Sequence, residues 1–421
     1  MKSIIKRQIK EQTVIVPGSK SISHRMMICA SLSTGETIID NLLLSEDILL
    51  TIDALKSMGA SINQISGNQY SVKGFGGYPV KSDQRIYLGN SGTSMRLLAG
   101  IAALGSSRYT LTGNERMCER PMVELLDALS QLNIQAISEN ATGTPPVHIQ
   151  GGNRKGGRVH IDCSKSSQYL SSLLMMGGLL ENGLDIHLDT PPVSQPYIDL
   201  TMDIMKKFHV NARQMSSTQY KVDGQQFYTP GYFSVEPDLS NAGYFWAIGA
   251  VTGQMMFVDN INLNSLQGDL NQIKILEQMG CQLVVEDNRI GICGRKLTGV
   301  DVDMSDTPDA VPAIAVVASF AKGITRIRNI GHLRIKECDR IDVVASQLQK
   351  LGIQVKQGDD FLEITGGKHS GGFIETFNDH RIAMAFSIIG LLVDGIQIQN
   401  PGCVEKSFPN YWDIFDSLLG E

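Results

Sequence analysis

Apolar and polar positions follow an order along the chain that begins near Ser21. A polar turn there precedes an apolar run at residues 26–30, and a strand-like stretch follows at residues 36–40. An amphipathic segment then passes through residues 51–55 and stops at Gly59, where a further strand-like stretch begins. Helical spacing closed by a glycine predicts a helix, and short apolar runs between turn residues predict strands. The first copy of the pattern therefore predicts helix, strand, helix, strand and strand.

The same order returns at five later positions. Each new copy opens on a polar turn before an apolar helix, beginning at Ser91, Ser166, Leu239, Thr307 and Asn378. Second helices end in the same way at Gly280 and at Gly352. About six copies of about 70 residues account for the chain, a period typical of repeat architectures. The alternative is a chance likeness between ordinary α/β units.

The repeats divide into two groups of three. A length of 421 residues exceeds what one hydrophobic core commonly serves. We expect the chain to change domain after Pro17 and again before Glu236. One domain would then combine residues 1–17 with 236–421, and the other would be residues 18–235. Two domains joined by two connections would place a cleft and a hinge between them.

Composition and charge narrow the class of protein. Hydrophobic residues make up 42% and charged residues 19% of the chain, without an apolar run long enough to span a membrane. The N-terminus is too short in apolar residues for a secretory signal, so we expect a cytoplasmic protein without membrane partners. Seven scattered cysteines without a C-x-x-C pair indicate reduced thiols and give no support to a zinc cluster. A formal charge of −6 argues against nucleic-acid binding, although converging basic residues could still bind small anions.

Several predicted helices begin with residues suited to anions. Backbone N–H groups and the positive end of the helix favour negative ligands there. Lys20, Ser21 and Arg25 accompany the first start, Gly92 the second, and the Ser166–Gln168 stretch the third. Each start also reads as an ordinary capped helix, and the turn at 116–121 reads as a solvated surface turn.

The second half of the chain carries a denser group of charges. Residues 334–340 hold five charged side chains, and the stretch 378–381 precedes an apolar helix. A solvated helix face is the alternative for the first, and capping is the alternative for the second and for Asp309. Lys406 reads by itself as part of an ordinary loop.

Taken together and in this order, seven motifs resemble those of the 5-enolpyruvylshikimate-3-phosphate synthases. They are Lys-Ser-x-Ser-x-Arg at 20–25, Gly-Asn-x-Gly-Thr-x-x-Arg at 89–96, Glu-Arg-Pro at 119–121, Ser-x-Gln at 166–168, Arg-x-Lys-Glu-x-Asp-Arg at 334–340, Asn-Asp-His-Arg at 378–381 and Lys-Ser-Phe-Pro at 406–409. The resemblance implies an inside-out α/β fold of six βαβαββ repeats in two domains. It also implies a monomer that acts on small molecules and needs neither a cofactor nor a metal.

The resemblance also assigns substrates and residues. Enolpyruvyl would pass from phosphoenolpyruvate to the 5-hydroxyl of shikimate 3-phosphate, through a tetrahedral ketal that loses phosphate, in the shikimate pathway to chorismate and the aromatic amino acids. Contacts to shikimate 3-phosphate would come from Lys20, Ser21, Arg25, Ser166, Ser167, Gln168, Ser194, Tyr197, Asp309 and Lys336. Contacts to phosphoenolpyruvate would come from Lys20, Gly92, Arg120, Gln168, Arg340, Arg381 and Lys406. Closure of the two domains would complete the site and expel water.

The reaction needs one proton donor and one acceptor. We expect Glu337 to act as the general acid and Asp309 as the base, with Lys20 as a further catalytic group. The two roles are open to exchange between the addition and elimination steps.

Two other functions remain open from the sequence. One is the related transfer of enolpyruvyl to UDP-N-acetylglucosamine. That family has Lys-Asn at its start and a reactive cysteine five residues before an Arg-Pro pair, where this chain has Lys20-Ser21 and Glu115, with Cys118 displaced. The other is a non-catalytic anion-binding protein on the same fold, which would not require the acid and base groups.

Overall fold

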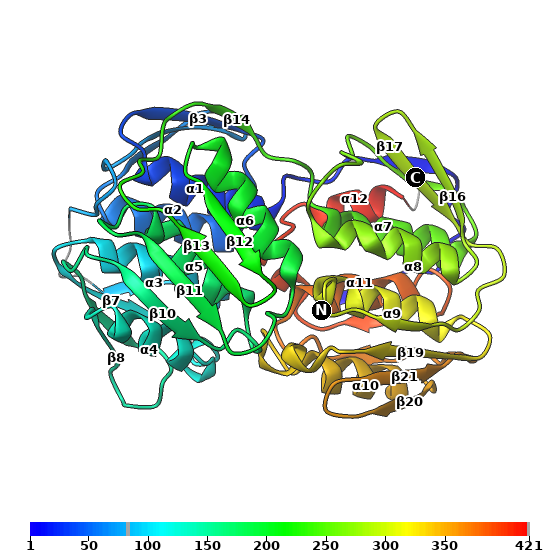
Figure 1. Ribbon diagram of the computed structural model, residues 1–421. Coiled ribbons are helices and arrows are strands. Elements are labelled where there is room, and N and C mark those ends of the chain that lie inside the picture. The colour runs from blue at the N-terminus through cyan, green and yellow to red at the C-terminus, as the bar shows by residue number, and fades with distance from the viewer. Residues whose placement is uncertain (81–84, 419–421) are drawn as a thin grey trace. The chain divides into compact units, whose positions relative to one another are not determined.

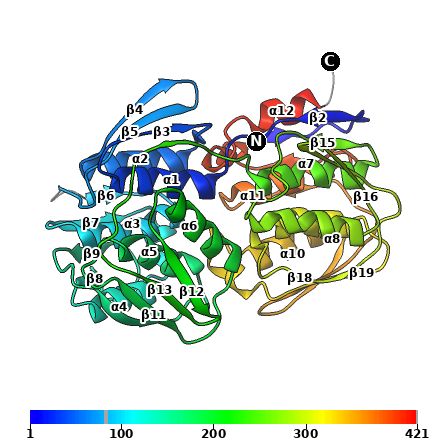
Figure 2. The same ribbon diagram turned by 45° about the horizontal axis from the view of Figure 1, so that its top comes forward.

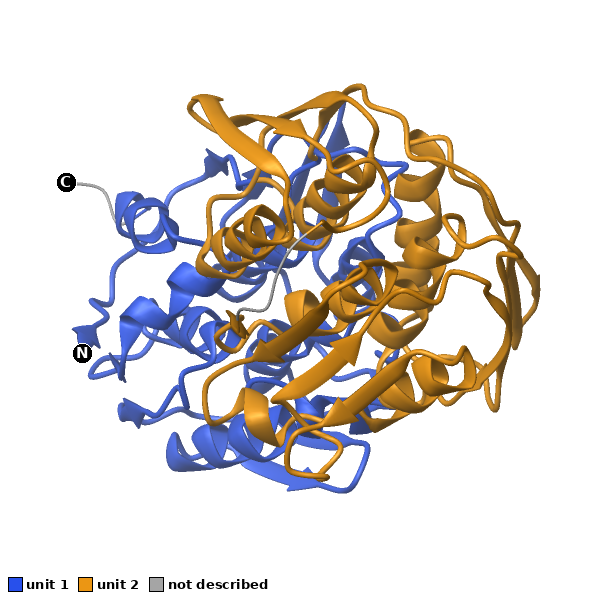
Figure 3. Ribbon diagram, turned by 90° about the vertical axis from the view of Figure 1, so that its left-hand side faces the viewer, with its two compact units in different colours: residues 1–17, 236–421 blue, residues 18–235 orange. Residues whose placement is uncertain are grey.

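Two compact units make up the chain in the computed structural model, which describes residues 1–80 and 85–418. Unit 1 combines residues 1–17 with residues from 236 onward, and unit 2 spans 18–235 (Figure 3). The described strands form six sheets, three in each unit.

Unit 2 contains helices that alternate with single strands and with groups of three strands (Figure 1). Its helices are α1 (Lys20–Leu32), α2 (Glu46–Ser57), α3 (Gly92–Leu104), the 3-10 helix η1 (Met117–Glu119), α4 (Val123–Gln131), α5 (Ser167–Gly177) and α6 (Gln195–Lys207). Its strands are β3 (Glu36–Asp40), β4 (Ser61–Ser66), β5 (Gln69–Lys73), β6 (Arg85–Tyr87), β7 (Arg108–Thr112), β8 (Gln135–Ser138), β9 (Val147–Gln150), β10 (Gly157–Ile161), β11 (Leu184–Leu188), β12 (Ala212–Ser216), β13 (Gln219–Val222) and β14 (Tyr232–Ser234).

Unit 1 repeats this composition. Its helices are α7 (Leu239–Thr252), η2 (Gly268–Asn271), α8 (Gln272–Gln278), η3 (Pro308–Ala310), α9 (Val311–Ser319), η4 (Gly331–Ile335), α10 (Arg340–Lys350), α11 (His380–Ile389), η5 (Pro401–Lys406) and α12 (Tyr411–Ser417). Its strands are β1 (Lys2–Ser3), β2 (Gln12–Val14), β15 (Met256–Val258), β16 (Gln282–Glu286), β17 (Arg289–Cys293), β18 (Asp301–Asp303), β19 (Ile324–Arg328), β20 (Gln354–Gln357), β21 (Leu362–Thr365), β22 (Phe373–Ile374) and β23 (Gln397–Ile398).

The four-stranded sheets share one topology. In β6-β7-β9-β8, for example, β6 and β7 are parallel across α3, and the β8–β9 hairpin adds antiparallel to β7. A parallel pair requires a crossover such as a helix, whereas the antiparallel strands need only a turn. The order β10-β11-β13-β12 and the order β18-β19-β21-β20 repeat this arrangement. Each copy is therefore a βαβαββ unit.

The strands at the boundaries of each unit pair with sheets of that same unit. β14, at the end of unit 2, pairs in parallel with β3, and β2, near the N-terminus, pairs in parallel with β15. β1 adds antiparallel to β23 in the three-stranded sheet of unit 1. The strands at the N-terminus thus belong to sheets of the C-terminal half of the chain.

In each repeat, one helix lies inside its unit. Nearly every residue of α3 and α7 is buried, as expected for helices that are apolar all round. In unit 2, α3 packs against α5, and α5 packs against α6 (Figure 2). The second helices bury one face only, as α2 does through Ile48, Ile52 and Leu55 at helical spacing. Helices therefore form the core of each unit, and sheets cover them.

The predicted helix starts are confirmed. The six inner helices begin at Lys20, Gly92, Ser167, Leu239, Val311 and His380, each within a few residues of the expected turn. The second helices α2, α8 and α10 also end where the Gly stops indicated. None of the helices in the described parts of the chain has the length and apolar character needed to cross a membrane.

Candidate active site

In unit 2, Arg25 brings together residues from α1, α5 and α6. Its Nη1 donates to the carbonyl oxygen of Ser21 at 3.0 Å, and its Nη2 donates to that of Tyr197 at 3.3 Å. Its Nε donates to Thr201 Oγ1 at 2.7 Å, and Ser171 Oγ accepts from Nη2 at 3.4 Å. Burial lowers the pKa of Arg25 to about 10, which leaves the guanidinium charged at neutral pH. Arg25 therefore holds the backbone of Ser21 and Tyr197 in place and keeps a positive charge next to them.

Lys20, the first residue of α1, pairs with an acid that the sequence did not single out. Its Nζ lies 3.3 Å from Asp47 Oδ2, with only 12% of the lysine side chain and 3% of the aspartate side chain exposed. Asp47 lies in the first turn of α2, where an acidic residue is ordinary, so no motif distinguishes it. Next to it, Thr51 Oγ1 forms a 2.7 Å hydrogen bond with Ser94 Oγ of α3. The position of Lys20 is thus tied to α2, and α2 is tied to the start of α3.

At the start of α3, Gly92 lies directly against the guanidinium of Arg120. A Cβ atom at residue 92 would be 2.6 Å from Arg120 Nη2, too close for a carbon to occupy. Arg120 is 4% exposed, and its Nη1 donates to the carbonyl oxygen and to Oδ1 of Asn90 at 3.2 and 3.3 Å. Arg120 is therefore buried at the α3 start, and the alternative of a solvated turn is wrong for this residue, although Glu119 beside it is exposed.

The start of α5 reaches the same end of α3. Gln168 Nε2 donates to Thr93 Oγ1 at 3.0 Å, and Gln168 Oε1 accepts from Arg96 Nη1 at 2.9 Å. Ser166 is the N-cap and accepts from the backbone N–H of Gln168, and Ser167 is buried beside it. Arg96 belongs to the second motif and is not among the predicted site residues. The structure gives it the role of orienting the Gln168 amide.

Ser194 takes an uncommon backbone conformation. It has φ +56° as the N-cap of α6, in the left-handed region that few non-glycine residues adopt. Such strain is commonly found at functional positions. The sequence does not predict this left-handed conformation, because serine has no preference for it.

In unit 1, Arg340 joins the predicted acid and the predicted base. Its Nη1 lies 2.9 Å from Asp309 Oδ1, and its Nη2 lies 2.7 Å from Glu337 Oε2. Its Nε binds Asp379 Oδ2 at 2.8 Å, and the Arg340 side chain is only 1% exposed. Burial alone would lower the pKa of Arg340, but the carboxylates of Asp379, Glu337 and Asp309 outweigh it and raise that pKa well above its usual value. The alternative of a solvated helix face is wrong for this residue.

Arg381 completes this group from the first turn of α11. Its Nη2 lies 2.7 Å from Asp309 Oδ2, so Asp309 bridges the two arginines. Asp379 caps α11 by accepting from the backbone N–H of Arg381 at 2.9 Å. Asp309 itself makes ion pairs and is not the N-cap of its helix, which is Thr307.

Two further lysines lie on the same unit. Lys336 is the C-cap of η4, and together with burial its charge lowers the pKa of His332 to about 3. Lys406 ends η5 and is 5% exposed, and η5 packs against α11. Among the described residues, no group of three or more His, Cys, Asp or Glu side chains is placed to hold a metal ion.

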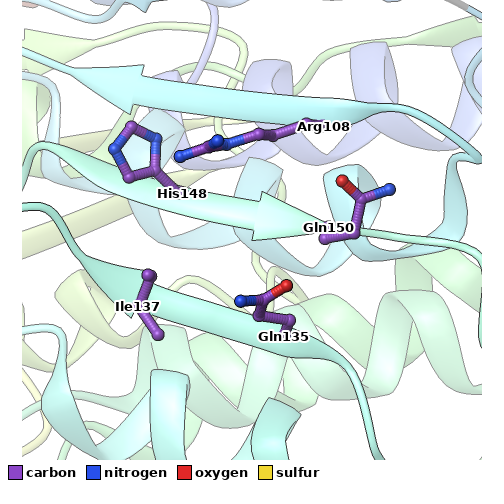
Figure 4. Close-up of a pocket in the computed structure, with 5 residues that line it drawn as sticks. All are labelled: Arg108, Gln135, Ile137, His148 and Gln150. Carbon is purple, nitrogen blue, oxygen red and sulfur yellow. The ribbon is translucent and has the colours of Figure 1, made fainter.

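One surface hollow of unit 2 is lined by none of these residues. It measures about 330 Å³ and is lined by Arg108, Gln135, Ile137, His148 and Gln150, which rise from β7, β8 and β9 on one side of their sheet (Figure 4). None of the predicted site residues belongs to it.

In the described parts of the chain, five four-stranded sheets and one three-stranded sheet cover the inner helices, and buried cations, hydroxyls and carboxylates gather at several of the helix starts, so the chain is an α/β protein with charged groups at the ends of its helices. Comparison with known proteins gives the family. A family model described as EPSP synthase (3-phosphoshikimate 1-carboxyvinyltransferase) matches residues 6–415. The chain belongs to the EPSP synthase family.

Individual relatives agree along nearly the whole chain. A 3-phosphoshikimate 1-carboxyvinyltransferase of Colwellia psychrerythraea is 42% identical over 404 residues, covering 95% of each chain. One of Shewanella baltica is 41% identical over 409 residues, covering 96% of each. The solved structure of EPSP synthase from Acinetobacter baumannii has a TM-score of 0.83 at 29% identity, covering 99% of this chain and 97% of that one. These comparisons confirm the predicted family, the inside-out α/β fold and the class of enolpyruvyl transferase.

Proposed function

We propose that the chain transfers the enolpyruvyl group of phosphoenolpyruvate to the 5-hydroxyl of shikimate 3-phosphate and releases inorganic phosphate. Membership of the EPSP synthase family over residues 6–415 supports the reaction. One observation supports the assignment of the reaction to specific residues: the buried guanidinium of Arg340 forms ion pairs with both Asp309 and Glu337. The reaction needs both a proton donor and a proton acceptor, and these two carboxyl groups are held by the same side chain and suit those roles.

The acceptor would be bound mainly by unit 2. Ser21 and Tyr197 lie around Arg25, whose fixed positive charge suits the phosphate of shikimate 3-phosphate. The hydroxyls and the amide side chain at the start of α5 would add neutral hydrogen bonds to the acceptor. The backbone N–H groups of that helix start would also attract its negative charge. The proposed contacts are Lys20, Ser21, Arg25, Ser166, Ser167, Gln168, Ser194 and Tyr197, with Asp309 and Lys336 from unit 1.

Phosphoenolpyruvate carries a carboxylate and a phosphate, so its binding needs several cations. We assign to it Lys20, Gly92, Arg120 and Gln168 of unit 2, and Arg340, Arg381 and Lys406 of unit 1. Gly92 permits the close approach of Arg120 to the start of α3, which concentrates positive charge there. Most N–H groups of Arg340 bind carboxylates of the protein. Its main contribution is therefore the positive potential and the fixed position of Asp309 and Glu337.

The chemistry proceeds by addition and elimination. In the addition, Glu337 donates a proton to the methylene carbon while the 5-hydroxyl oxygen attacks C2 and loses its proton to Asp309. In the elimination, the Glu337 carboxylate takes a proton from the new methyl group while the C–O bond to phosphate breaks, and the departing phosphate takes up the proton held by Asp309. Lys20 would stabilise the phosphate oxygens as they gain charge. Positioned acids and bases contribute on the order of 10² to 10⁴ in rate each.

We further propose that the enzyme works as a monomer in the cytoplasm, where the thiols of its seven cysteines stay reduced. Its partners would be the two small-molecule substrates.

The related transfer to UDP-N-acetylglucosamine is not favoured, because the relatives named above are 3-phosphoshikimate 1-carboxyvinyltransferases. A competition experiment tests the acceptor directly. Purified protein receives phosphoenolpyruvate with equal amounts of shikimate 3-phosphate and UDP-N-acetylglucosamine, and mass spectrometry identifies the product. Only the enolpyruvyl derivative of shikimate 3-phosphate is expected, and formation of the nucleotide-sugar product instead would reject the proposal.

The same assay tests the acid. Glu337→Gln keeps the shape of the side chain but cannot donate a proton, so turnover should fall by about 10² to 10⁴. Glu363→Gln is the matched control, because Glu363 lies on β21 and makes only a 3.6 Å surface pair with Arg326. Equal loss in both variants would remove Glu337 from the chemistry.

A further inference from the structure

A buried carboxyl group that the proposed reaction does not use lies on η2 of unit 1. Asp269 is 4% exposed, and its Oδ2 accepts a hydrogen bond from Ser240 Oγ at 2.6 Å. Its Oδ1 is buried and has no hydrogen-bond partner among the described residues. A carboxylate in such a position is costly to ionise unless a cation compensates it.

Arg381 is a cation whose charge favours ionised Asp269, and both residues contact α7. Ser240, which binds Asp269, and Tyr244 are four residues apart on α7 and therefore lie on the same face, one turn from each other. Tyr244 Oη accepts from Arg381 Nη1 at 3.4 Å. Helix α7 thus carries contacts to Asp269 and to Arg381 on neighbouring turns.

Asp309 lies in the same region. The short helices η2 and η3 both pack against α7. Helix α11 packs against α7 as well (Figure 2). η3 brings Asp309, whose Oδ2 pairs with Arg381 Nη2 at 2.7 Å. Arg381 consequently has the Asp309 carboxylate bound to it, and its charge also acts on Asp269.

The charged groups that face Asp269 come from three elements. Asp238 caps α7, Asp309 comes from η3 and Arg381 from α11. On α8, which packs against η2, the charged residues Lys274 and Glu277 are exposed. Burial first, and then the charge of Asp309, raise the pKa of Asp269 to about 7, and Arg381 only partly opposes them.

We propose that Asp269 is a positioning residue whose bound proton keeps the charge of Arg381 available for the anionic substrate. This inference rests on the proposed function, in which Arg381 binds phosphoenolpyruvate. When Asp269 is neutral, it adds no negative charge near Arg381, and Arg381 attracts the substrate. When Asp269 ionises, a second negative charge competes with the substrate for Arg381, and the affinity falls.

The sign of the effect follows from linkage. Because the substrate is an anion, it binds more tightly to the protonated form, and binding near neutral pH takes up part of a proton. For charges separated by about one helical turn to two in a partly polar interior, the difference in affinity is on the order of tenfold. Ionisation of Asp269 should therefore raise KM for phosphoenolpyruvate as pH rises through about 7, with a smaller change in kcat.

The test compares KM for phosphoenolpyruvate from pH 5.5 to 9 in the wild type, in Asp269→Asn and in the control Glu277→Gln. The amide is neutral at every pH, so the KM of Asp269→Asn should keep its low-pH value where the other two proteins rise about tenfold. Taking the ratio of two proteins' KM values at each pH removes the titration of the substrate itself. A wild-type slope retained in Asp269→Asn would overturn the proposal.

Ser240→Ala provides a second and opposite test, including the case in which Asp269→Asn fails to fold. The Ser240 hydroxyl stabilises the ionised form of Asp269, so its removal should move the rise in KM to higher pH. A rise at unchanged pH contradicts the inference. Absence of turnover in the wild type would instead refute the proposed function, so the two failures are distinguishable.

Discussion

Replacing Arg340 by methionine removes the buried cation that three carboxylates share. The side chain is 1% exposed, and it pairs with Asp379, Glu337 and Asp309 at 2.8, 2.7 and 2.9 Å. Methionine fills much of the same volume, so the change removes mainly charge and hydrogen bonds. The perturbation therefore isolates the electrostatic role of Arg340 in unit 1.

The expected loss follows from how deeply each partner is buried. Asp379 is 0% exposed and Glu337 10%, whereas Asp309 at 22% can be partly hydrated. Removing one partner of a buried ion pair costs about 3–5 kcal/mol, because the remaining charge is left uncompensated. Against a typical total stability of about 5–15 kcal/mol, this loss is large. It should shrink at lower pH, because the remaining carboxylates then take up protons.

Urea unfolding followed by tryptophan fluorescence measures this loss of stability in unit 1, where Arg340 lies. The chain has two tryptophans, Trp246 and Trp412, and both lie in unit 1. The control is Arg326→Met, which removes a surface pair of 3.6 Å and should cost less than about 1 kcal/mol. If Arg340→Met destabilised unit 1 no more than this control does, the argument that Arg340 compensates buried charge would be refuted.

Three further substitutions or reagents test other parts of the structure. Gly92→Ala places a carbon 2.6 Å from Arg120 Nη2, so the guanidinium must shift. KM for phosphoenolpyruvate should then rise about tenfold or more in steady-state assays. An unchanged KM would show that Arg120 does not bind that substrate. His332→Gln should leave the shape of the pH profile of kcat/KM unaltered between pH 5 and 9, because burial and the charge of Lys336 lower the pKa of His332 to about 3; a lost inflection would show that His332 titrates in that range. Thiol titration of the native protein should detect Cys118 alone, since the other six cysteines are buried, and fast reaction of several thiols would contradict that burial.

The sequence predicted the starts of the inner helices because a polar turn before an apolar run is a local signal. The structure bears this out at Lys20, Gly92 and His380. The residue types at those turns, such as Ser166 and Asp379, also cap their helices, so local reasoning could not separate capping from binding. Only the order of the motifs along the chain favoured a site.

Other features depend on contacts between distant segments and could not be predicted locally. Arg25 reads as a charged residue one turn into a helix, yet it is buried by α5 and α6, which lie about 150 residues further along the chain. Asp47 and Asp269 belong to no motif, because an acid near a helix start is common. Their positions beside Lys20 and behind Arg381 arise from the packing of α1 on α2 and of η2 on α7.

Release of inorganic phosphate from phosphoenolpyruvate tests the central claim most directly. The purified protein is given phosphoenolpyruvate with and without shikimate 3-phosphate, and phosphate is measured together with the acceptor consumed. We predict one phosphate released for each shikimate 3-phosphate consumed, and none without the acceptor. Release without the acceptor, or only with UDP-N-acetylglucosamine, would contradict the account.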